Sequence, residues 1–382
     1  MKVLLHIGQS KTGTSAIQAF LTLNRNRLRE HRILYPAARV KGMTLNLGAH
    51  NAVADSLLGK IQFPYLSANE YFDQFFDDAK KINANLLILS AEHFFGGEPR
   101  IWGVRDETEY FELYRKKIEI LAGYLAGHDV SILAYLRPQV DWMESAVSQT
   151  VRIERLISQR RIYQNDRQFY ELMRPLLKYA DLLDAWQEGI NPSSFTVIPY
   201  VRNALHQKSS VADFLKRAGL DRIDFEYADS NLQVNTSLNR EFIEVKKILN
   251  ETIRSKNEER TIIRCMENLS QSNPQDGEYA LDPDVRREIE DFSIEQNSRI
   301  NQRFMSAGHS LSAASGKKAP IPLGETEIRK ALQIFIAEFK RPKYRVLQWS
   351  FVLRAFLRAK ARPVQAALHQ LKALYWSWKY KH

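Results

Sequence analysis

The first 29 residues constrain the fold of this chain most, because they read as a strand, a turn and a helix in close succession. The segment 3–7 is short and apolar, which is typical of a strand buried on both faces of a parallel sheet. Glycine, serine and threonine are frequent in the turn 8–15, and apolar residues then recur at helical spacing to about residue 29. A helix that starts directly after a turn points unpaired N–H groups at it. The sequence therefore predicts a strand–helix unit whose turn is suited to holding an anion.

Strands and helices alternate through the first half of the chain. Apolar runs at 85–89, 130–136 and 195–198 predict three more strands, and the periodicity of 109–126 and 140–156 predicts helices between them. Such alternation is typical of right-handed crossovers in a parallel sheet. We therefore expect an α/β fold in which a doubly wound parallel sheet is flanked by helices.

The pattern becomes helical from about residue 203, which predicts a helical C-terminal half. The stretch 306–325 is rich in glycine, serine and proline and predicts a linker. The expected organisation is therefore an α/β domain over 1–305, the linker 306–325, and a basic amphipathic helical tail over 326–382.

The net charge of +11 is carried almost entirely by the end of the chain. Residues 341–382 hold ten lysines and arginines and no acid, which leaves 45 basic and 44 acidic residues before them. Globular domains that coat nucleic acid usually carry a basic face of their own, so we expect no specific nucleic acid as a partner. Hydrophobic residues at 44% and charged residues at 26% indicate an ordinary globular chain.

The number of cysteines and the lengths of the apolar runs further restrict the class of protein. A single cysteine, Cys265, excludes an intrachain disulfide and a cysteine-based zinc cluster. The stretch 3–7 is shorter than the apolar core of a signal peptide, and the longest apolar runs are too short to cross a bilayer. We therefore expect a cytoplasmic protein.

The turn after the first strand offers several kinds of group to an anion. Its residues are Gly8, Gln9, Ser10, Lys11, Thr12, Gly13, Thr14 and Ser15. The glycines let the backbone approach a ligand closely, the hydroxyls add donors, and the lysine adds a mobile ammonium. The lysine follows the first glycine by three residues and does not follow the last one, so the turn departs from the Walker pattern of magnesium-dependent nucleotidases. The simpler interpretation is a glycine-containing turn with a solvated lysine.

A second candidate anion contact lies where the strand predicted at 130–136 ends. Arg137 stands at the carboxyl edge of the expected sheet, where open parallel sheets bind ligands. Ser145 follows eight residues later, about two helical turns on, so an elongated anion along that helix would touch both side chains. The alternative is an ion pair of Arg137 with Asp141 or Glu144, together with a surface serine.

Together the two motifs resemble those of the sulfotransferases that use 3′-phosphoadenosine 5′-phosphosulfate (PAPS). The turn 8–15 matches the 5′-phosphosulfate loop of that family, and Arg137 with Ser145 matches its 3′-phosphate-binding pair. Shorter phrases make the chain most similar to the bacterial enzymes that sulfate cell-surface polysaccharide or lipid-linked glycans; they lie at 33–36, 90–92, 213–215 and 235–238. The resemblance spans about residues 2–305 and does not reach the tail.

The resemblance implies a P-loop-like fold and transfer of a sulfuryl group from PAPS to an acceptor hydroxyl of a glycan or lipid-linked saccharide. It also implies that adenosine 3′,5′-bisphosphate (PAP) is the product, that no metal is required, and that Lys11 neutralises charge on the leaving oxygen. The acceptor needs a general base, for which Glu92, His93 and His50 are candidates. Glu92 is favoured because it directly follows a predicted strand. For the two histidines the competing interpretation is a structural or solvated imidazole.

The tail predicts a further contact, because residues 341–382 combine basic and aromatic residues without acids. This composition favours peripheral binding to an anionic membrane surface at the inner face of the membrane. The alternatives are packing on the body, packing on another subunit, or binding of polyanions. Two other functions also stay open: a P-loop kinase or nucleotidase that uses ATP, and a non-catalytic adaptor that binds nucleotides or polyanions.

Overall fold

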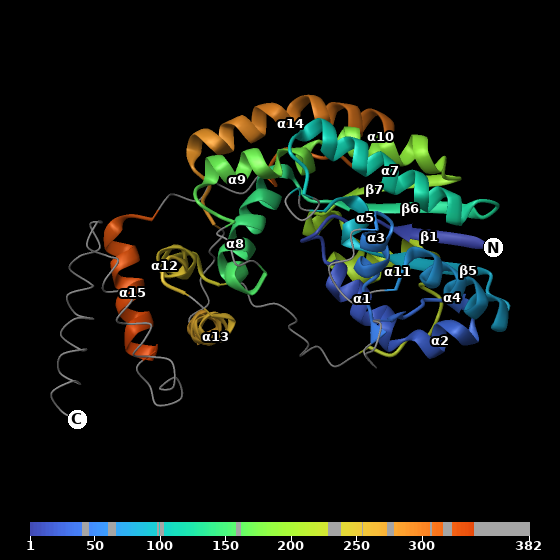
Figure 1. The fold of residues 1–382 in the computed structure, drawn as a ribbon, viewed down its shortest axis with the longest axis horizontal. Coiled ribbons are helices and arrows are strands. Elements are labelled where there is room, and N and C mark those ends of the chain that lie inside the picture. Colours follow the sequence, from blue (N-terminus) through green and yellow to red (C-terminus); the bar gives the residue numbers. More distant parts are fainter. Residues whose placement is uncertain are drawn as a thin grey trace. The chain divides into compact units, whose positions relative to one another are not determined.

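The structure is a computed structural model in which the chain forms two compact units (Figure 1). The first unit comprises residues 1–142, 172–234 and 287–315, and the second comprises 143–171, 235–286 and 316–382. The structure describes residues 1–39, 46–59, 66–97, 99, 103–157, 162–227, 238–253, 255–272, 279–305, 308–315 and 323–339. The basic segment 341–382, with its expected membrane contact, lies outside the described residues.

The first unit is built on a five-stranded parallel sheet with the strand order β2-β5-β1-β6-β7. Its strands are β1 (Lys2–His6), β2 (Ile33–Leu34), β5 (Leu86–Ser90), β6 (Asp129–Leu136) and β7 (Ser194–Pro199). Four of them lie within one residue of the predicted strands at both ends. The α/β class with a parallel sheet flanked by helices is therefore confirmed.

Strand β1 occupies the centre of the sheet. His6 at its end lies opposite Ser90 of β5 on one side and Leu133 of β6 on the other. The chain leaves β1 first toward β2 and β5 and later returns to the other side through β6 and β7. The carboxyl end of β1 is therefore the point where the strand order reverses, which is where such sheets bind ligands.

Helices cover both faces of the sheet, because successive residues of a strand point to opposite sides. One face carries α1 (Thr14–Leu23), α2 (Arg25–Glu30) and α11 (Ser210–Arg217). Their buried residues Ile17, Leu28 and Phe214 form one core with Leu4 and Ile88 of the sheet. The opposite face carries α7 (Glu107–Leu125) and α10 (Tyr179–Ile190), as Figure 1 shows.

The single helix expected over 15–29 is divided into α1 and α2 at Asn24. The Asn24 side chain donates to the Phe20 carbonyl at 3.0 Å and to the Glu226 carbonyl at 2.9 Å. A side-chain amide that bonds to nearby backbone competes with the helix, so asparagine favours helix ends.

Smaller elements surround the β5 side of the sheet. They are the antiparallel pair β3 (Ala38–Arg39) and β4 (Asn46–Leu47), and the helices α3 (Asn51–Ser56), α4 (Ala68–Lys81) and α5 (Glu92–Phe95). Helix α4 begins with a capping box, in which Ser67 and Glu70 satisfy each other's backbone N–H groups. Helix α5 follows β5 directly and so begins at the carboxyl edge of the sheet.

The described part of the second unit is helical. Helices α8 (Gln139–Ile157), α9 (Asp166–Met173) and α14 (Pro283–Arg303) contribute to both units, and α12 (Arg240–Asn250), α13 (Lys256–Ser272) and α15 (Glu325–Phe339) complete the set. Lys246 and Glu259 form a fully buried ion pair at 2.9 Å, and the ammonium also donates to the Val151 carbonyl at 3.3 Å. None of the helices in the described ranges is long and apolar enough to cross a bilayer.

Part of the stretch expected to be a linker is held against the first unit. Leu311 is buried, and the Asn301 side chain accepts its N–H at 2.8 Å and donates to its carbonyl at 3.1 Å. The Val140 N–H donates to the Ala313 carbonyl at 2.9 Å. Residues 308–315 are therefore fixed by contacts that the glycine- and serine-rich composition does not reveal.

Candidate functional site

The turn after β1 runs alongside the end of β6 and then leads into α1. The Ile7 N–H donates to the Leu133 carbonyl at 3.0 Å, and the Gln9 N–H donates to the Tyr135 carbonyl at 3.2 Å. The backbone then passes through the left-handed region at Lys11 (φ 70°) and Gly13 (φ 75°). For Lys11 this conformation costs roughly 1 kcal/mol, so the surrounding turn must impose it.

Gly8 lies where the turn passes directly over a buried histidine. A Cβ on Gly8 would lie 2.7 Å from His6 Nε2 and 2.9 Å from Thr14 Cγ2. The imidazole of His6 is fully buried, and burial lowers its pKa to about 3. The neutral ring therefore packs against the turn at Gly8 and leaves no space for a side chain there.

Gly13 lies where the first residues of two helices meet. A Cβ there would lie 2.7 Å from the Ser210 hydroxyl oxygen and 2.9 Å from the Tyr200 hydroxyl oxygen. Ser210 is the first residue of α11, and Gly13 is the N-cap of α1. Both helices therefore direct the positive end of their dipole toward the same turn.

The other hydroxyls of the turn divide between protein contacts and solvent. The Thr12 hydroxyl donates to the Gln9 carbonyl at 2.5 Å and stabilises the turn itself. The Ser10 hydroxyl oxygen accepts from Trp142 Nε1 at 3.2 Å, and Ser15 is exposed in the first turn of α1. Ser10 and Ser15 are thus closer to solvent than the buried Thr12.

Gln9 ties the turn to Arg137. Its Oε1 accepts the Arg137 N–H at 3.2 Å, and its Nε2 donates to the Tyr179 hydroxyl at 2.7 Å. The same hydroxyl donates to the Arg137 carbonyl at 3.0 Å, so three hydrogen bonds form a closed ring. Gln9 and Tyr179 are buried and Arg137 is partly buried. The two motifs predicted to bind an anion therefore share one edge of the sheet, on the neighbouring strands β1 and β6.

The Arg137 charge acts on two phenols at this edge. Burial raises the pKa of Tyr179, whereas the hydrogen bond from Gln9 and the charge of Arg137 lower it. Burial also raises the pKa of Tyr200, and Arg137 and Arg202 lower it. Since Tyr200 also lies against Gly13, its hydroxyl has the turn on one side and two cations within electrostatic reach.

Ser145 lies on α8 and is partly buried. It belongs to the second unit whereas Arg137 belongs to the first, so their action as a pair stays a prediction. Of the acids proposed as alternative partners of Arg137, Glu144 forms an ion pair with Arg286 at 2.8 Å.

Glu92 is the base candidate that contacts the turn directly. It opens α5 after β5, and the Thr14 hydroxyl donates to its Oε1. The carboxylate is partly buried beside the first residue of α1. Glu92 thus lies at the carboxyl edge of the sheet and contacts the turn through Thr14, and its role as base stays a prediction.

His93 faces a different neighbour. Its Nδ1 lies 2.8 Å from Oδ1 of Asp55 on α3, and 37% of its side chain is exposed. The carboxylate accepts the Nδ1 proton, which leaves Nε2 as the nitrogen able to accept a proton.

His50 has a structural role. The Ser90 N–H donates to its Nδ1 at 2.9 Å, so Nε2 carries the proton and donates to the Pro36 carbonyl at 2.8 Å. Burial lowers the pKa of His50 to about 4, although the hydrogen bond to the Pro36 carbonyl raises it. Both ring nitrogens are engaged, so His50 joins β5 to the segment after β2 and has no nitrogen left for an acceptor.

Sequence reasoning missed Tyr179, Tyr200 and Asp55. Tyr200 directly follows the strand predicted at 195–198, so its place at the carboxyl edge could have identified it. Tyr179 and Asp55 reach Gln9 and His93 across long separations in sequence, for which one sequence holds no signal.

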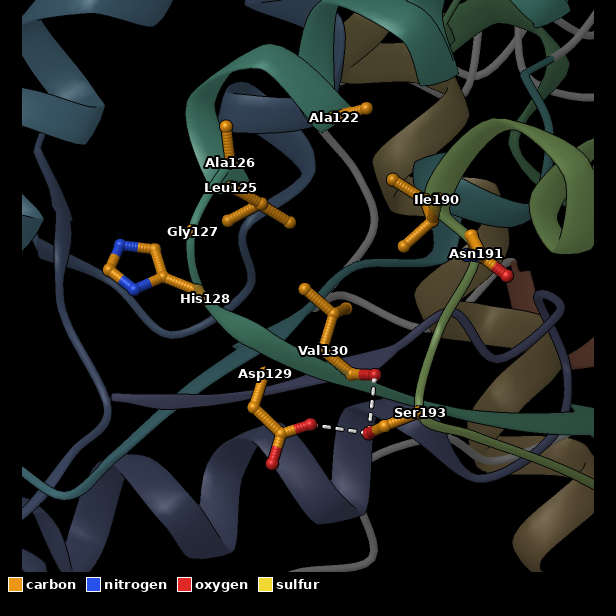
Figure 2. A pocket seen from close by; sticks show the side chains of 10 residues that line it. All are labelled: Ala122, Leu125, Ala126, Gly127, His128, Asp129, Val130, Ile190, Asn191 and Ser193. Atoms are coloured by element: carbon orange, nitrogen blue, oxygen red, sulfur yellow. Dashed lines mark hydrogen bonds between the residues drawn. The ribbon is translucent and has the colours of Figure 1, made fainter.

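A small cavity of about 280 Å³ lies at the other edge of the sheet, at the start of β6 (Figure 2). Leu125, Val130 and Ile190 line it, and the Ser193 hydroxyl beside them donates to Asp129 and to the Val130 carbonyl. Arg137 follows the opposite end of the same strand, roughly 25 Å away at about 3.3 Å per residue. The cavity is therefore separate from the candidate site.

The described residues include no group of three or more His, Cys, Asp or Glu side chains placed to hold a metal ion. No protein-family model and no curated protein matches the sequence. A solved structure similar to this chain is that of a sulfotransferase from Alicyclobacillus acidocaldarius, with 14% sequence identity and a TM-score of 0.37. The match covers 78% of this chain and 94% of that one. At this TM-score the similarity identifies no function.

Proposed function

We propose that this protein is a sulfotransferase that moves the sulfuryl group of PAPS to a hydroxyl of a glycan or lipid-linked saccharide. The observation that carries the proposal is the hydrogen-bonded ring of Gln9, Tyr179 and Arg137. Through the backbone of Arg137 it joins a lysine-bearing turn to the residue that directly follows β6. PAPS and its product PAP carry anionic groups on both the 5′ and the 3′ oxygens of one ribose, so they suit two cationic positions held side by side.

The turn fits the 5′ end of such a ligand. The N-termini of α1 and α11 converge at Gly13, and Lys11 belongs to the same turn. Helix N-termini and backbone N–H groups bind phosphate without any requirement for sequence. The guanidinium of Arg137 then serves the 3′-phosphate, with Ser145 as its proposed partner on α8.

Once the donor is bound, the reaction needs two groups from the protein: one that stabilises the leaving oxygen and one that accepts a proton. The acceptor oxygen forms a bond to sulfur while the bond from sulfur to the 5′-phosphate oxygen breaks, so negative charge grows on the leaving oxygen. Lys11 supplies the opposing charge at that point. Glu92, directed to the turn by the Thr14 hydroxyl, takes the proton that the acceptor hydroxyl loses.

A lipid-linked acceptor would be held at a membrane surface, and the basic segment 341–382 supports this choice by its composition alone. Vesicles with anionic lipid should retain the full chain better than a chain ending after Phe339, which keeps α15. Equal retention of the two chains would contradict the membrane contact and leave the sulfotransferase proposal untouched.

Calorimetry with PAP, ATP and ADP tests the donor class. The proposal expects PAP to bind at least about tenfold more tightly than ATP, because a 3′-phosphate paired with arginine adds roughly 1.5–3 kcal/mol. Tighter binding of ATP, with a nucleotidase activity that a chelator abolishes, would favour a P-loop kinase or nucleotidase instead.

The variant Lys11→Ala tests the role of the ammonium, and Lys2→Ala at the exposed start of β1 is its matched control. Lys11→Ala should slow the release of PAP from PAPS by about 10²–10³-fold, the usual cost of one group that stabilises a leaving charge. Lys2→Ala should react like the parent. A protein without turnover that binds nucleotide equally well in all three forms would be an adaptor.

A further inference from the structure

Helix α5 is too short to be stable by itself. It has four residues, and a single turn of helix does not form in isolation because nucleation costs more than one hydrogen bond returns. Yet α5 carries Glu92, the side chain that meets the phosphate-binding turn. Whatever fixes α5 also fixes this carboxylate.

The N-terminal part of α5 is held from α1 and α3. The Thr14 hydroxyl of α1 donates to Glu92, and the His93 N–H donates to Oδ1 of Asn51 at 3.3 Å. Asp55, also on α3, accepts from the His93 ring at 2.8 Å. These contacts fix one end of the helix and leave its last carbonyl groups to another partner.

That partner is Lys117, a lysine buried within α7. Its Nζ donates to the His93 carbonyl at 2.8 Å and to the Phe94 carbonyl at 2.9 Å. It also lies 4.7 Å from the centre of the Tyr114 ring. An ammonium has three N–H donors, so it can serve both carbonyls and also face the aromatic ring. A cation at the C-terminus of a helix also opposes the negative end of its dipole.

Burying the Lys117 side chain costs free energy, which indicates that its charge and its N–H donors are needed at this place. Its side chain is 1% exposed, and burial lowers its pKa to about 7, with the Asp55 carboxylate acting in the opposite direction. An apolar side chain would fill this space at no such cost but would leave both carbonyls unpaired. The neighbouring Tyr110 hydroxyl donates to the Gly97 carbonyl at 3.3 Å, so α7 holds the chain just after α5 as well.

We propose that Lys117 is a positioning residue of the acceptor side: through the carbonyls of His93 and Phe94 it sets the orientation of α5, and thereby keeps Glu92 against the phosphate-binding turn. This inference rests on the proposed sulfotransferase function. Lys117 touches neither donor nor acceptor. Helix α5, which it positions, follows β5 on one side of β1, whereas Arg137 follows β6 on the other side.

The test compares Lys117→Met with Lys116→Met, the same change at an exposed position of the same helix. Hydrogen–deuterium exchange of residues 92–97 should become faster in Lys117→Met alone, and this measurement needs no activity. Affinity for PAP should stay within about twofold of the parent, because the turn and Arg137 keep their contacts. Release of PAP from PAPS with water as acceptor should slow by about a hundredfold, the effect of a base displaced by about 1 Å.

Lys117→Arg keeps a buried cation with several donors and should restore part of the turnover lost in Lys117→Met. Unchanged exchange and unchanged turnover in Lys117→Met would overturn the inference, as would a loss of PAP affinity as large as the loss of turnover. If Lys117→Met does not fold, Lys117→Arg and Lys117→Gln are compared in the same way. A parent protein that does not bind PAP would instead overturn the sulfotransferase proposal, whatever the exchange shows.

Discussion

Replacing Gly8 by alanine adds one methyl group at the point where the turn 8–15 passes over His6. The new carbon would lie 2.7 Å from His6 Nε2, 2.9 Å from Thr14 Cγ2 and 3.3 Å from the Thr12 hydroxyl oxygen. Gly8 is not among the residues with positive φ, so an alanine can adopt the backbone conformation without strain. The effect of the substitution is therefore steric.

The imidazole below Gly8 cannot easily move away. His6 is fully buried, and its Nδ1 lies 2.8 Å from the Ser90 hydroxyl oxygen. The rings of Tyr135 and Phe214 lie 5.6 Å and 5.3 Å from its centre. Overpacking of this kind costs about 1–3 kcal/mol, and the lower chain entropy of alanine offsets roughly 0.5 kcal/mol of it. A net loss of about 1–2 kcal/mol is expected, with the turn displaced to relieve the contact.

Thermal unfolding and calorimetry with PAP measure the two consequences. Gly8→Ala should lower the melting temperature by a few degrees and weaken PAP binding by about tenfold or more, because a displaced turn no longer fits the phosphate. The matched control is Gly123→Ala in α7, where a new Cβ meets nothing within 4 Å. It should raise stability by about 0.5–1 kcal/mol, as alanine does in helices, and leave binding unchanged. A Gly8→Ala protein that melts and binds PAP like the parent would refute the reasoning.

Three further predictions follow from other contacts. Below pH 6.5 the unfolded chain binds a proton at His50, whereas the folded protein binds it only near pH 4, so the free energy of unfolding should decrease as the pH falls through this window. His50→Asn should show a smaller decrease in melting temperature over the same range. Lys246→Met should destabilise the second unit by about 3–5 kcal/mol in denaturant unfolding because it removes the cation paired with the buried Glu259 carboxylate, and the double variant Lys246→Met/Glu259→Leu should recover most of the loss. Glu92→Gln should slow PAPS turnover by about 10²–10⁴-fold at unchanged PAP affinity; a change confined to affinity would contradict its role as base.

Local patterns in the sequence were enough to predict most of the sheet. Strands β5, β1 and β6 are mostly apolar, because both faces of a central parallel strand are covered, and their boundaries follow from composition. The edge strand β7 shows a weaker apolar pattern that was still enough to predict it. The two-residue edge strand β2 is too short to give such a pattern. Asn24 divides a helix that periodicity alone joins, because its side chain bonds to the backbone of a distant segment.

The candidate site likewise has one part that the sequence predicts and another part that it does not. The glycines, hydroxyls and lysine of the turn are adjacent in the chain, so their meeting at the start of α1 was predictable. In the ring of Gln9, Tyr179 and Arg137, Gln9 is more than a hundred positions from its two partners, and the contact of Lys117 with α5 depends on how α7 packs. Such contacts follow from tertiary packing, for which a single sequence provides no periodicity or spacing.

Binding of PAP and of adenosine 5′-monophosphate, measured side by side on the parent and on Arg137→Ala, tests most directly whether one nucleotide bridges the turn and Arg137. The parent should prefer PAP by about ten- to a hundredfold, since the extra 3′-phosphate meets a guanidinium. Arg137→Ala should lose this preference and bind the monophosphate as the parent does. An equal preference for PAP in both proteins would show that Arg137 does not contact the nucleotide held by the turn, and would contradict the account.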